Sequence, residues 1–509
     1  MTTANVVFLL VVAASSAFFA LNVERLVSYL RIGRPVTRTD RGFRRLANVL
    51  VVALGQAKLM RDPGPGIMHA LIFWGFIVLT AGTIELVAQG VYPPFSYAFL
   101  PTWAYRWYSL SQDVFGVLVL GAVAFALYRR LVVHPRRLQG DGLEQADAII
   151  ILSAIAALMV TMFLANAFLL VSEPTSVVRE KALSHALARA FAGMDPGTAS
   201  TAYAVSWWTH ALLIFAFLNY LPYSKHLHIV SSVPNVYFSN AQGLGTRGAI
   251  PRLDLEAEGV EQFGASDVEH LTWKQLLDGY SCTECGRCTA ACPANITGKV
   301  LSPRKIIINA RQRLMEKAPL LVGDRSELQS PALVHGEGDD AGARTVTDIL
   351  EHRLLDHYIT EQELWQCTTC RACVQECPVG IEHLDTIIDL RRNLVLMESR
   401  FPAEVQPAFE SMERQGSPWA FSPGDRARWA DGLDIPTMAD VVQRGESVDV
   451  LFWVGCMGSF DDRAKRITVS FARIMKAAGI RFAILGQEEQ CNGDPARRMG
   501  NEYLWQTLA

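Results

Sequence analysis

Eight of the ten cysteines in this 509-residue chain fall into two copies of one spacing, C-x2-C-x2-C-x3-C, and a proline follows each copy. Thiolates at these intervals are the ligands of cubane iron–sulfur clusters, whereas a zinc site needs only one or two C-x2-C pairs. The spacing therefore predicts two [4Fe–4S] clusters. The first run is Cys282, Cys285, Cys288 and Cys292, and the second is Cys367, Cys370, Cys373 and Cys377.

The fourth cysteine of each run is expected to serve the cluster of the other run. In proteins that hold two such clusters, three cysteines of a run bind one cube and the fourth reaches the second cube. Thiolate-ligated clusters need a reducing compartment, so this part of the chain is expected in the cytoplasm. We assign cluster one to Cys282, Cys285, Cys288 and Cys377, and cluster two to Cys367, Cys370, Cys373 and Cys292.

Histidines in apolar sequence form a second group of candidate ligands. His69 and His228 stand at matching depths of two apolar segments, and His226 precedes His228 by two residues. One neutral imidazole from each of two helices can hold a haem b iron from both sides. His210 lies 18 residues, or five helical turns, before His228 and shares its face if the helix continues past Pro222. The pattern predicts one haem b and leaves a second open, with ordinary bundle histidines as the alternative.

Five apolar stretches must position these histidines, because each is long enough to cross the roughly 30 Å hydrocarbon core of a bilayer. The first five residues carry no positive charge, so the first stretch is interpreted as a span and not as a signal peptide. Arginine and lysine concentrate in the loops after the first and third stretches, which predicts an external N-terminus and a cytoplasmic C-terminal half. The stretches are 5–24, 67–89, 111–133, 147–171 and 203–223.

Two further features bear on partners. Glu85 lies in the second stretch toward its outer end, where a carboxylate is a candidate for protonating a quinone; a solvated residue at a helix end is the alternative. The net charge of −3 gives no reason to expect a nucleic-acid partner.

The rest of the sequence divides by composition and pattern. Helices are expected at about 303–316, where Ser302-Pro303 is a typical helix start, and at 348–365 and 383–398. The expected parts are a linker at 231–268, an iron–sulfur domain at 269–395 with an exposed insertion at 318–347, and a polar helical linker at 396–446.

Residues 447–509 carry a strand–helix–strand pattern. The segments "VDVLFWVGC" and "RFAILG" are the expected strands, with a helix near 461–478 between them. Cys456 closes the first strand and Cys491 follows the second, so both thiols are candidates for redox or metal chemistry. Two buried free cysteines are the alternative.

The segments "IMHALIFWGFIVL" and "WWTHALLIFAFLNYLPYSKHLHIVSSVP" resemble the two haem-bearing helices of the cytochrome b (gamma) subunit of respiratory nitrate reductase and of the membrane subunit of heterodisulfide reductase. This resemblance implies a haem between His69 and His228. The family's second histidine on the earlier helix would fall at Leu79, which cannot bind iron. An outer haem at His210 is therefore five-coordinate, differently ligated or absent.

The soluble half carries two more resemblances. Its cluster loops among helices resemble the alpha-helical ferredoxin domain, and residues 447–509 resemble the first half of the cysteine-rich domain of the heterodisulfide reductase catalytic subunit. That family has Cys-Cys-Gly where this chain has Cys491-Asn492-Gly493, so a third iron–sulfur cluster at Cys456 and Cys491 stays open. The family's second repeat does not occur before residue 509, and we expect this domain to be truncated.

Together these features predict a multi-domain protein: an all-α five-helix transmembrane haem b bundle at 1–230, an α-helical two-[4Fe–4S] ferredoxin domain and a partial α/β cysteine-rich domain. The order resembles membrane-bound, heterodisulfide-reductase-like oxidoreductases of the electron-transfer-flavoprotein:menaquinone type. The resemblance implies a plasma-membrane enzyme that passes electrons from reduced electron transfer flavoprotein, or another soluble dehydrogenase, to menaquinone. Two alternatives are a disulfide or sulfur-compound reductase acting at Cys456 and Cys491, and a non-catalytic conduit subunit.

Overall fold

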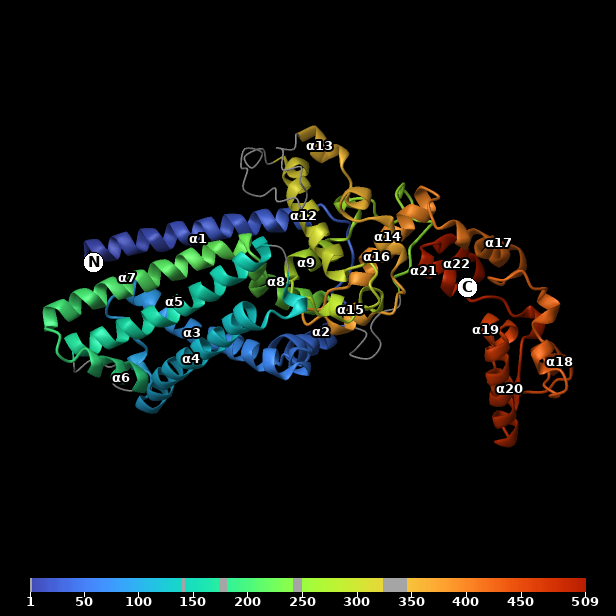
Figure 1. Ribbon diagram of the computed structural model, residues 1–509, viewed down its shortest axis with the longest axis horizontal. Helices are drawn as coiled ribbons and strands as arrows, with labels where there is room; N and C mark the ends of the chain where they lie inside the picture. Colours follow the sequence, from blue (N-terminus) through green and yellow to red (C-terminus); the bar gives the residue numbers. More distant parts are fainter. Residues whose placement is uncertain (1, 140–141, 174–180, 241–249, 324–345) are drawn as a thin grey trace. The chain divides into compact units, whose positions relative to one another are not determined.

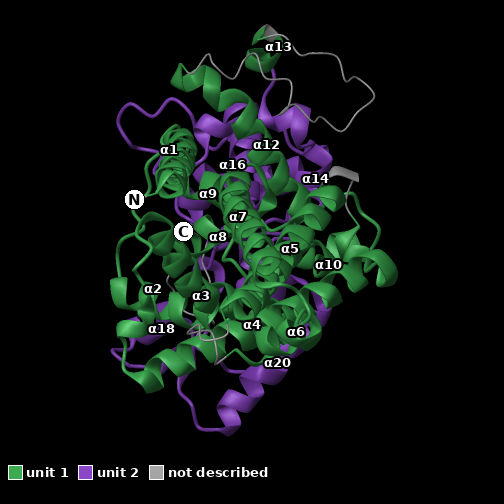
Figure 2. Cartoon of the chain, turned by 90° about the vertical axis from the view of Figure 1, so that its left-hand side faces the viewer, with its two compact units in different colours: residues 1–248, 272–351, 371–383 green, residues 249–271, 352–370, 384–509 purple. Residues whose placement is uncertain are grey.

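The computed structural model describes residues 2–139, 142–173, 181–240, 250–323 and 346–509 (Figure 1). These residues form two compact units, which Figure 2 shows in different colours. Most of the insertion predicted at 318–347 lies outside the described residues. Unit 1 contains residues 1–248, 272–351 and 371–383, and unit 2 contains residues 249–271, 352–370 and 384–509.

Five long helices form a bundle in unit 1, and they are the helices of the described residues that are long and apolar enough to cross a membrane. α1 packs against α3 and α7, α3 against α4, and α5 against both α4 and α7. Large apolar side chains such as Leu10, Leu21 and Val205 remain exposed on the bundle surface, as lipid contact requires. The helices are α1 (Thr3–Leu30), α3 (Pro63–Val91), α4 (Thr102–Tyr128), α5 (Gly142–Ser172) and α7 (Pro196–Tyr220).

α7 ends at Tyr220 and does not continue to His228. Two 3-10 turns, η7 (Leu221–Tyr223) and η8 (Lys225–Leu227), separate it from α8 (His228–Phe238). Pro222 stands in the first of these turns, where it lacks the amide hydrogen that would extend the α7 ladder. The assumption that His210 and His228 share one face of a continuous helix is therefore wrong.

Helices flank the cysteines that lie in unit 1. α9 (Trp273–Ser281) leads directly into Cys282, and α12 (Pro303–Val322) follows the first run. The predicted start of α12 is confirmed: Ser302 Oγ accepts a hydrogen bond from the Lys305 amide at 3.3 Å. The other helices of this part are α10 (Arg287–Ala290), α11 (Pro293–Ile296), α13 (Val346–Glu351) and α15 (Ala372–Glu376).

Described residues of both predicted linkers pack into the fold. Within 231–268, the polar Asn235 of α8 is fully buried in unit 1, and Ala265 and Val268 are fully buried in unit 2. Within 396–446, Phe409 and Met412 of α17 (Gln406–Gln415) join a buried core of unit 2. These residues are packed because a few apolar side chains among many polar ones suffice to anchor short helices, and helices expected within 396–446 are present. The helix predicted at 348–365 is also broken, since a π turn, η12 (Leu354–Tyr358), separates α13 from α14 (Glu361–Trp365).

The C-terminal part of unit 2 has the order strand, two helices, strand. β1 (Val450–Leu451) and β2 (Phe482–Ala483) pair in parallel, with Val450 opposite Phe482. The crossover consists of α19 (Gly455–Phe460) and the amphipathic α20 (Asp462–Ala477), and Ala472 and Met475 of α20 pack against Phe482. The remaining helices of unit 2 are α16 (His383–Arg392), which begins in unit 1, α18 (Met438–Gln443), α21 (Asp494–Met499) and α22 (Glu502–Leu508).

Candidate functional site

The two cysteine runs fold into loops with the same backbone pattern. In the first loop, Glu284 and Gly286 adopt positive φ angles of 55° and 70° on either side of Cys285. In the second, Thr369 and Arg371 adopt φ angles of 56° and 64° on either side of Cys370. Three of these four residues are not glycine, so the left-handed conformation has a cost that the surroundings must offset. The repeat seen in the sequence is thus also a repeat of backbone geometry.

The cysteines assigned to cluster one all belong to unit 1 and are gathered there. Cys282 and Cys377, which are 95 positions apart, pack in one buried group with Ile307 and Ile381. The Ile381 amide donates to Cys377 Sγ at 3.4 Å, a contact that favours the thiolate. Burial raises the pKa of Cys288 well above its usual range, and the negative charges of Cys282, Cys285 and Cys377 raise it further.

This gathering of buried thiols suits a thiolate-bound cluster. Burial, only partly offset by the Arg311 guanidinium, raises the pKa of Cys282 to about 12, so its thiolate needs compensation from a metal. Across the described residues, no three His, Cys, Asp or Glu side chains converge tightly enough to hold a single metal ion. A four-iron cube is wider than an ion and needs its ligands spread around it.

The cysteines assigned to cluster two are divided between the units. Cys292 and Cys373 lie in unit 1, and Cys367 and Cys370 lie in unit 2, so this ligand set stays a prediction. Within unit 2, the buried guanidinium of Arg391 donates to the Cys367 carbonyl at 2.6 Å and to the Arg498 carbonyl at 2.6 Å. Arg391 thus connects the second cysteine loop to α21.

Two of the predicted haem ligands are oriented by oxygen acceptors. His69 Nδ1 lies 3.2 Å from Gln56 Oε1, and His228 Nδ1 lies 2.9 Å from the Lys225 carbonyl. A carbonyl oxygen only accepts, so with the Gln56 amide in this orientation each Nδ1 carries the proton and each Nε2 keeps the lone pair that binds a metal. Both imidazoles therefore have the tautomer that a bis-histidine haem needs.

The surroundings of this histidine pair also fit a polar prosthetic group. The His226 ring lies 5.1 Å from the His228 ring, and His226 Nδ1 is buried without a hydrogen-bond partner. Burial lowers the pKa of His226 to about 2, and the charges of His228, Lys225, His69 and Arg130 act in the same direction. Gln56 Nε2 is likewise buried and unpaired. Such orphaned polar atoms are rare in folded proteins and mark a place where a ligand atom is expected.

The structure gives His210 a hydrogen-bond partner on α5. Thr161 Oγ1 lies 2.9 Å from His210 Nδ1 and donates its own hydrogen to the Ala157 carbonyl at 2.8 Å. Leu79, the position that would supply the second ligand of an outer haem, packs instead against Val119 and Met159. An outer haem at His210 remains short of a ligand.

Glu85 is fully occupied by hydrogen bonds. Its Oε1 accepts from the Tyr97 amide at 2.8 Å and from Ser96 Oγ at 3.1 Å, and its Oε2 accepts from the Tyr108 hydroxyl at 2.6 Å. Glu85 is 16 residues from His69 on α3, which corresponds to about 24 Å along the helix. The carboxylate therefore anchors the turn between α3 and α4 at the opposite end of the bundle from His69.

Cys456 and Cys491 meet in the core of unit 2. Both are buried in one group with Phe409, and Arg426 Nη2 lies 3.4 Å from Cys456 Sγ. The Cys491 thiol and the Arg426 guanidinium lower the pKa of Cys456 to about 6, although burial opposes this shift. The same interaction raises the pKa of Cys491. The pair thus consists of a thiolate and a thiol near neutral pH.

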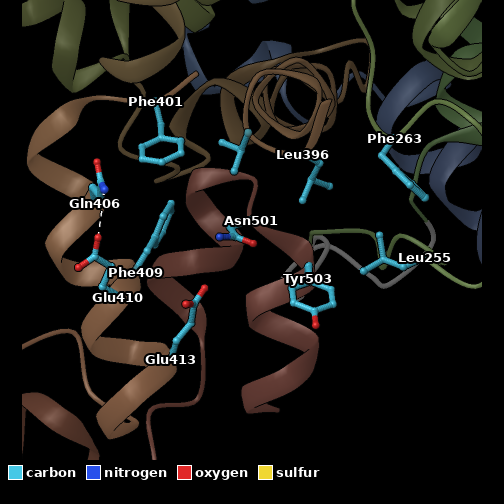
Figure 3. Close-up of a pocket in the computed structure, with 11 residues that line it drawn as sticks. Leu255, Phe263, Leu396, Phe401, Gln406, Phe409, Glu410, Glu413, Asn501 and Tyr503 are labelled. Atoms are coloured by element: carbon cyan, nitrogen blue, oxygen red, sulfur yellow. Dashed lines mark hydrogen bonds between the residues drawn. The ribbon is translucent and has the colours of Figure 1, made fainter. Parts of the chain in front are cut away.

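An open pocket of about 660 Å³ lies beside this core, because Phe409 and Val395 belong to both. Figure 3 shows Phe401 and Phe409 lining it together with Tyr503, with Glu410 and Glu413 on α17. The pocket combines aromatic and acidic side chains.

Sequence reasoning missed the polar residues that support these sites. Gln56, Arg391 and Arg426 lie between 13 and 30 residues from the ligands they contact. Lys58 lies 319 residues from Cys377, whose carbonyl it contacts. One signal was present: Gln56 and Lys58 lie in an apolar stretch where buried polar groups need partners.

Comparison with known proteins identifies the domains. Residues 281–381 match the family described as 4Fe-4S dicluster domain, and residues 450–509 match the family described as Cysteine-rich domain. No solved structure matches the chain.

Three relatives show how far the similarity extends. "Probable iron-sulfur-binding oxidoreductase FadF" of Bacillus subtilis (strain 168) is 36% identical over 99% of this chain and 72% of its own length. "EtfAB:quinone oxidoreductase" of Syntrophomonas wolfei is 34% identical over 95% of this chain and 68% of its own length. One subunit of the "Dihydromethanophenazine:CoB--CoM heterodisulfide reductase" of Methanosarcina mazei is 28% identical over 47% of this chain and 51% of its own length.

The matches agree with the geometry above: apolar helices, paired cysteine loops and a cysteine-rich segment occur in one chain. The protein is a membrane protein and an iron–sulfur oxidoreductase that transfers electrons. The chain belongs to the family of membrane-bound, heterodisulfide-reductase-like iron–sulfur oxidoreductases that includes FadF and EtfAB:quinone oxidoreductase.

Proposed function

We propose that this protein carries electrons from a soluble donor, reduced electron transfer flavoprotein, through two [4Fe–4S] clusters and one haem b to menaquinone. The name of the Syntrophomonas relative supports this donor and a quinone acceptor. The iron–sulfur parts face the cytoplasm and the N-terminus lies outside, as the distribution of arginine and lysine predicts. Each quinol formed takes up two electrons and two protons.

One observation carries the proposal: within unit 1, the loops of cluster one contact the same short segments that orient the histidine pair. Lys58, two residues after Gln56, donates from Nζ to the Cys377 carbonyl at 2.6 Å. Lys225, whose carbonyl lies against His228 Nδ1, places its Nζ 3.6 Å from Glu284 Oε2 in the first cysteine loop. Cluster one is therefore the immediate neighbour of the proposed haem.

Unit 2 supplies the other end of the path. Trp365, two residues before Cys367, packs against the core that holds Cys456 and Cys491, and its ring lies 5.3 Å from the Arg391 guanidinium. Cluster two is thus attached to the thiol pair, and cluster one to the haem ligands. This order makes the cysteine-rich segment the entrance, with a third cluster at Cys456 and Cys491 as an open possibility, and the bundle the exit.

The clusters and the haem supply one-electron redox chemistry when bound, and the chain supplies their ligands and insulation. Cys282, Cys285, Cys288 and Cys377 hold one cube, and buried apolar neighbours such as Ile307 exclude water from it. His69 and His228 would hold the haem iron through Nε2, because their Nδ1 atoms face oxygen acceptors.

Glu85 with Tyr108 is the proposed proton donor to the quinone. Glu85 lies about 24 Å along α3 from His69, so this role applies only if the second haem that was left open at His210 is present. Glu85→Gln keeps an acceptor for the Tyr97 amide but removes the exchangeable proton. Reoxidation of reduced haem by a menaquinone analogue should slow at least tenfold in this variant, while haem reduction is unchanged.

Metal and haem analysis of the purified full-length protein tests the proposal. Wild type should contain eight irons in two cubes plus one haem b; a second haem at His210 would raise the haem content to two, and a third cluster would add to the iron. His69→Met and His228→Met should each lose the haem and keep the iron–sulfur absorbance. His134→Asn, a control at an exposed histidine of the same bundle, should keep both. A wild-type protein without haem b refutes the membrane part of the proposal.

A second function is favoured by the Cys456 pair. A thiolate held by Arg426 beside a thiol is suited to reducing a disulfide or another sulfur compound, and the Methanosarcina relative is named as part of a heterodisulfide reductase. Rapid reduction of the clusters by a dithiol, together with no reduction by reduced electron transfer flavoprotein, would favour this function over the first. Reduction only in the presence of a co-purified subunit would instead indicate a conduit.

A further inference from the structure

Gln56, Ala57 and Lys58 form a short segment that contacts both proposed metal sites of unit 1. Gln56 Oε1 lies 3.2 Å from His69 Nδ1, and Lys58 Nζ lies 2.6 Å from the Cys377 carbonyl and 3.3 Å from the Val374 carbonyl. Gln56 is 2% exposed and Lys58 is 5% exposed, so both polar side chains are held inside the protein. Burying two polar side chains costs free energy unless their hydrogen bonds compensate for it, so these contacts are expected to serve a purpose in the protein.

The backbone of this segment is fixed from several sides. Gln56 adopts a φ of 50°, in the left-handed region, and its carbonyl accepts from the amides of Leu59 and Met60 in η2 (Leu59–Arg61). Arg287, the residue before Cys288, donates to the Lys58 carbonyl at 2.9 Å. The left-handed conformation of Gln56 is strained, and these hydrogen bonds hold the backbone in it.

Gly66 explains how the segment reaches His69. A Cβ at this position would lie 2.6 Å from the Leu59 carbonyl oxygen, a backbone atom that cannot move aside. Only glycine therefore lets η2 lie against the first turns of α3, one turn before His69. The sequence encodes a close approach at this point.

Lys225 makes a parallel connection on the other side of the histidine pair. Its carbonyl accepts from His228 Nδ1 at 2.9 Å, and its Nζ lies 3.6 Å from Glu284 Oε2. Glu284, between Cys282 and Cys285, is also bonded to Arg311. Each proposed haem ligand is thus linked to a loop of cluster one through three residues or fewer.

We propose that Gln56–Lys58 and Lys225 are positioning residues that fix the two haem-ligand imidazoles and the first cluster as one unit, and that Gln56 tunes the haem. The inference rests on the proposed haem at His69 and His228. A stronger acceptor at His69 Nδ1 makes the imidazole more basic and stabilises oxidised iron; removal of the acceptor has the opposite effect. Lys58, a cation beside Cys377, stabilises the more negative, reduced form of cluster one.

Optical redox titration of the haem in the full-length protein tests the role of Gln56. Gln56→Glu should raise the ratio of oxidised to reduced haem at a fixed potential at least tenfold, equivalent to 59 mV for one electron. Gln56→Met should lower the same ratio several-fold. Opposite signs are the signature, because a merely structural role would move both variants in one direction. The proposal is overturned if the haem ratio shifts in the same direction in both variants or does not shift. If Gln56→Met binds no haem, the proposal stands or falls with Gln56→Glu, which must raise the ratio of oxidised to reduced haem.

Gln112→Glu is the matched control for an added carboxylate. Gln112 is a buried glutamine of the same bundle, and its Nε2 donates to the Val78 carbonyl at 2.9 Å instead of meeting a histidine. Its haem ratio should stay within twofold of wild type. A tenfold change in this control would attribute the Gln56→Glu shift to long-range charge and overturn the hydrogen-bond assignment.

The lysine arm has its own readout in titrations of cluster one followed by electron paramagnetic resonance. Lys58→Met should lower the fraction of reduced cluster one at a fixed potential about tenfold and leave the haem ratio unchanged. Lys299→Met, at an exposed lysine of the same unit, should change neither. If the fraction of reduced cluster one is the same in Lys58→Met as in wild type, Lys58 does not stabilise the reduced cluster and that part of the proposal is wrong. A wild type without haem would refute the proposed function and not this lysine result, so the two failures are distinguishable.

Discussion

At the scale of single residues, the sites depend on buried polar groups whose partners lie far away in the sequence. Gln56 contacts His69, Arg391 donates to the Cys367 carbonyl, and Arg426 lies against Cys456 Sγ. In each case the ligand type was predictable from its spacing, and the supporting residue was not. A cysteine run is a local pattern, whereas a hydrogen bond across 24 or 30 residues exists only after folding.

His383 predicts how the stability of the iron–sulfur part depends on pH. It is 1% exposed, and burial, together with the charges of Lys58 and Lys274, lowers its pKa from 6.5 to about 3. His383 therefore takes up a proton near pH 6.5 in the unfolded chain but stays neutral in the folded chain. The free energy of unfolding decreases as the pH falls below 6.5. Between pH 7.5 and 5.5 this amounts to about 1.4 kcal/mol.

Thermal unfolding of wild type and His383→Leu at the two pH values checks this prediction, with the iron–sulfur absorbance as the signal. Wild type should lose about 1.4 kcal/mol more than the variant on going from pH 7.5 to pH 5.5, because every other titrating group is common to both. Equal losses in the two proteins would show that His383 is not held neutral.

At the scale of elements, Asp278 joins three segments of unit 1. Its carboxylate accepts from Lys274 Nζ at 2.7 Å, from Asn235 Nδ2 of α8 at 2.9 Å and from the Glu382 amide at 3.2 Å. Lys274 and Asp278 are both fully buried. Removal of one partner leaves a buried, uncompensated charge, so Asp278→Asn should destabilise unit 1 by about 3–5 kcal/mol.

The double variant Lys274→Met, Asp278→Asn is the control for Asp278. It removes both charges and should recover part of the loss in a denaturation experiment. If the free energy of unfolding of the double variant is lower than that of Asp278→Asn, the unpaired Lys274 charge is not what destabilises Asp278→Asn.

Gly286 predicts how the first cysteine loop meets the membrane bundle in unit 1. A Cβ there would lie 2.1 Å from the Arg137 carbonyl oxygen, and the φ of 70° is also unfavourable for other residues. Gly286→Ala should reduce the iron bound by cluster one. Gly298→Ala is matched, because Gly298 has a φ of 83° but nothing within 4 Å of its Cβ position, and should keep the iron. Equal iron loss in both variants would assign the effect to backbone strain of about 1–2 kcal/mol alone.

The elements that the sequence predicted well are those encoded by local pattern. The five spans and the Ser302 cap follow from runs of apolar residues and from capping chemistry. The two strands predicted near the C-terminal end are each only two residues long, and Cys456, predicted to close the first strand, lies in α19. The break after Tyr220 and the packed segments around Asn235 and Phe409 were not predicted, because a few buried contacts in tertiary structure override a polar composition.

At the scale of the whole molecule, the proposed chain of cofactors has a direction. In unit 2 the second cysteine loop adjoins the Cys456 pair, and in unit 1 the first loop adjoins the histidine pair. Cys367→Ser should therefore stop electrons before cluster one, whereas Cys377→Ser should stop them after cluster two. In rapid-freeze samples reduced from the donor side, Cys377→Ser should accumulate reduced cluster two with oxidised haem; a reduced haem in that variant would show that the order is wrong.

The central claim is that reduced electron transfer flavoprotein reduces a haem held by His69 and His228. Its most direct test is stopped-flow measurement of the haem b absorbance after reduced flavoprotein is mixed with membranes that contain the full-length protein. We expect rapid reduction in wild type, reoxidation by a menaquinone analogue, and a rate at least a hundredfold lower in Cys377→Ser. Haem that stays oxidised in wild type, or that is reduced as fast in Cys377→Ser as in wild type, would contradict the claim.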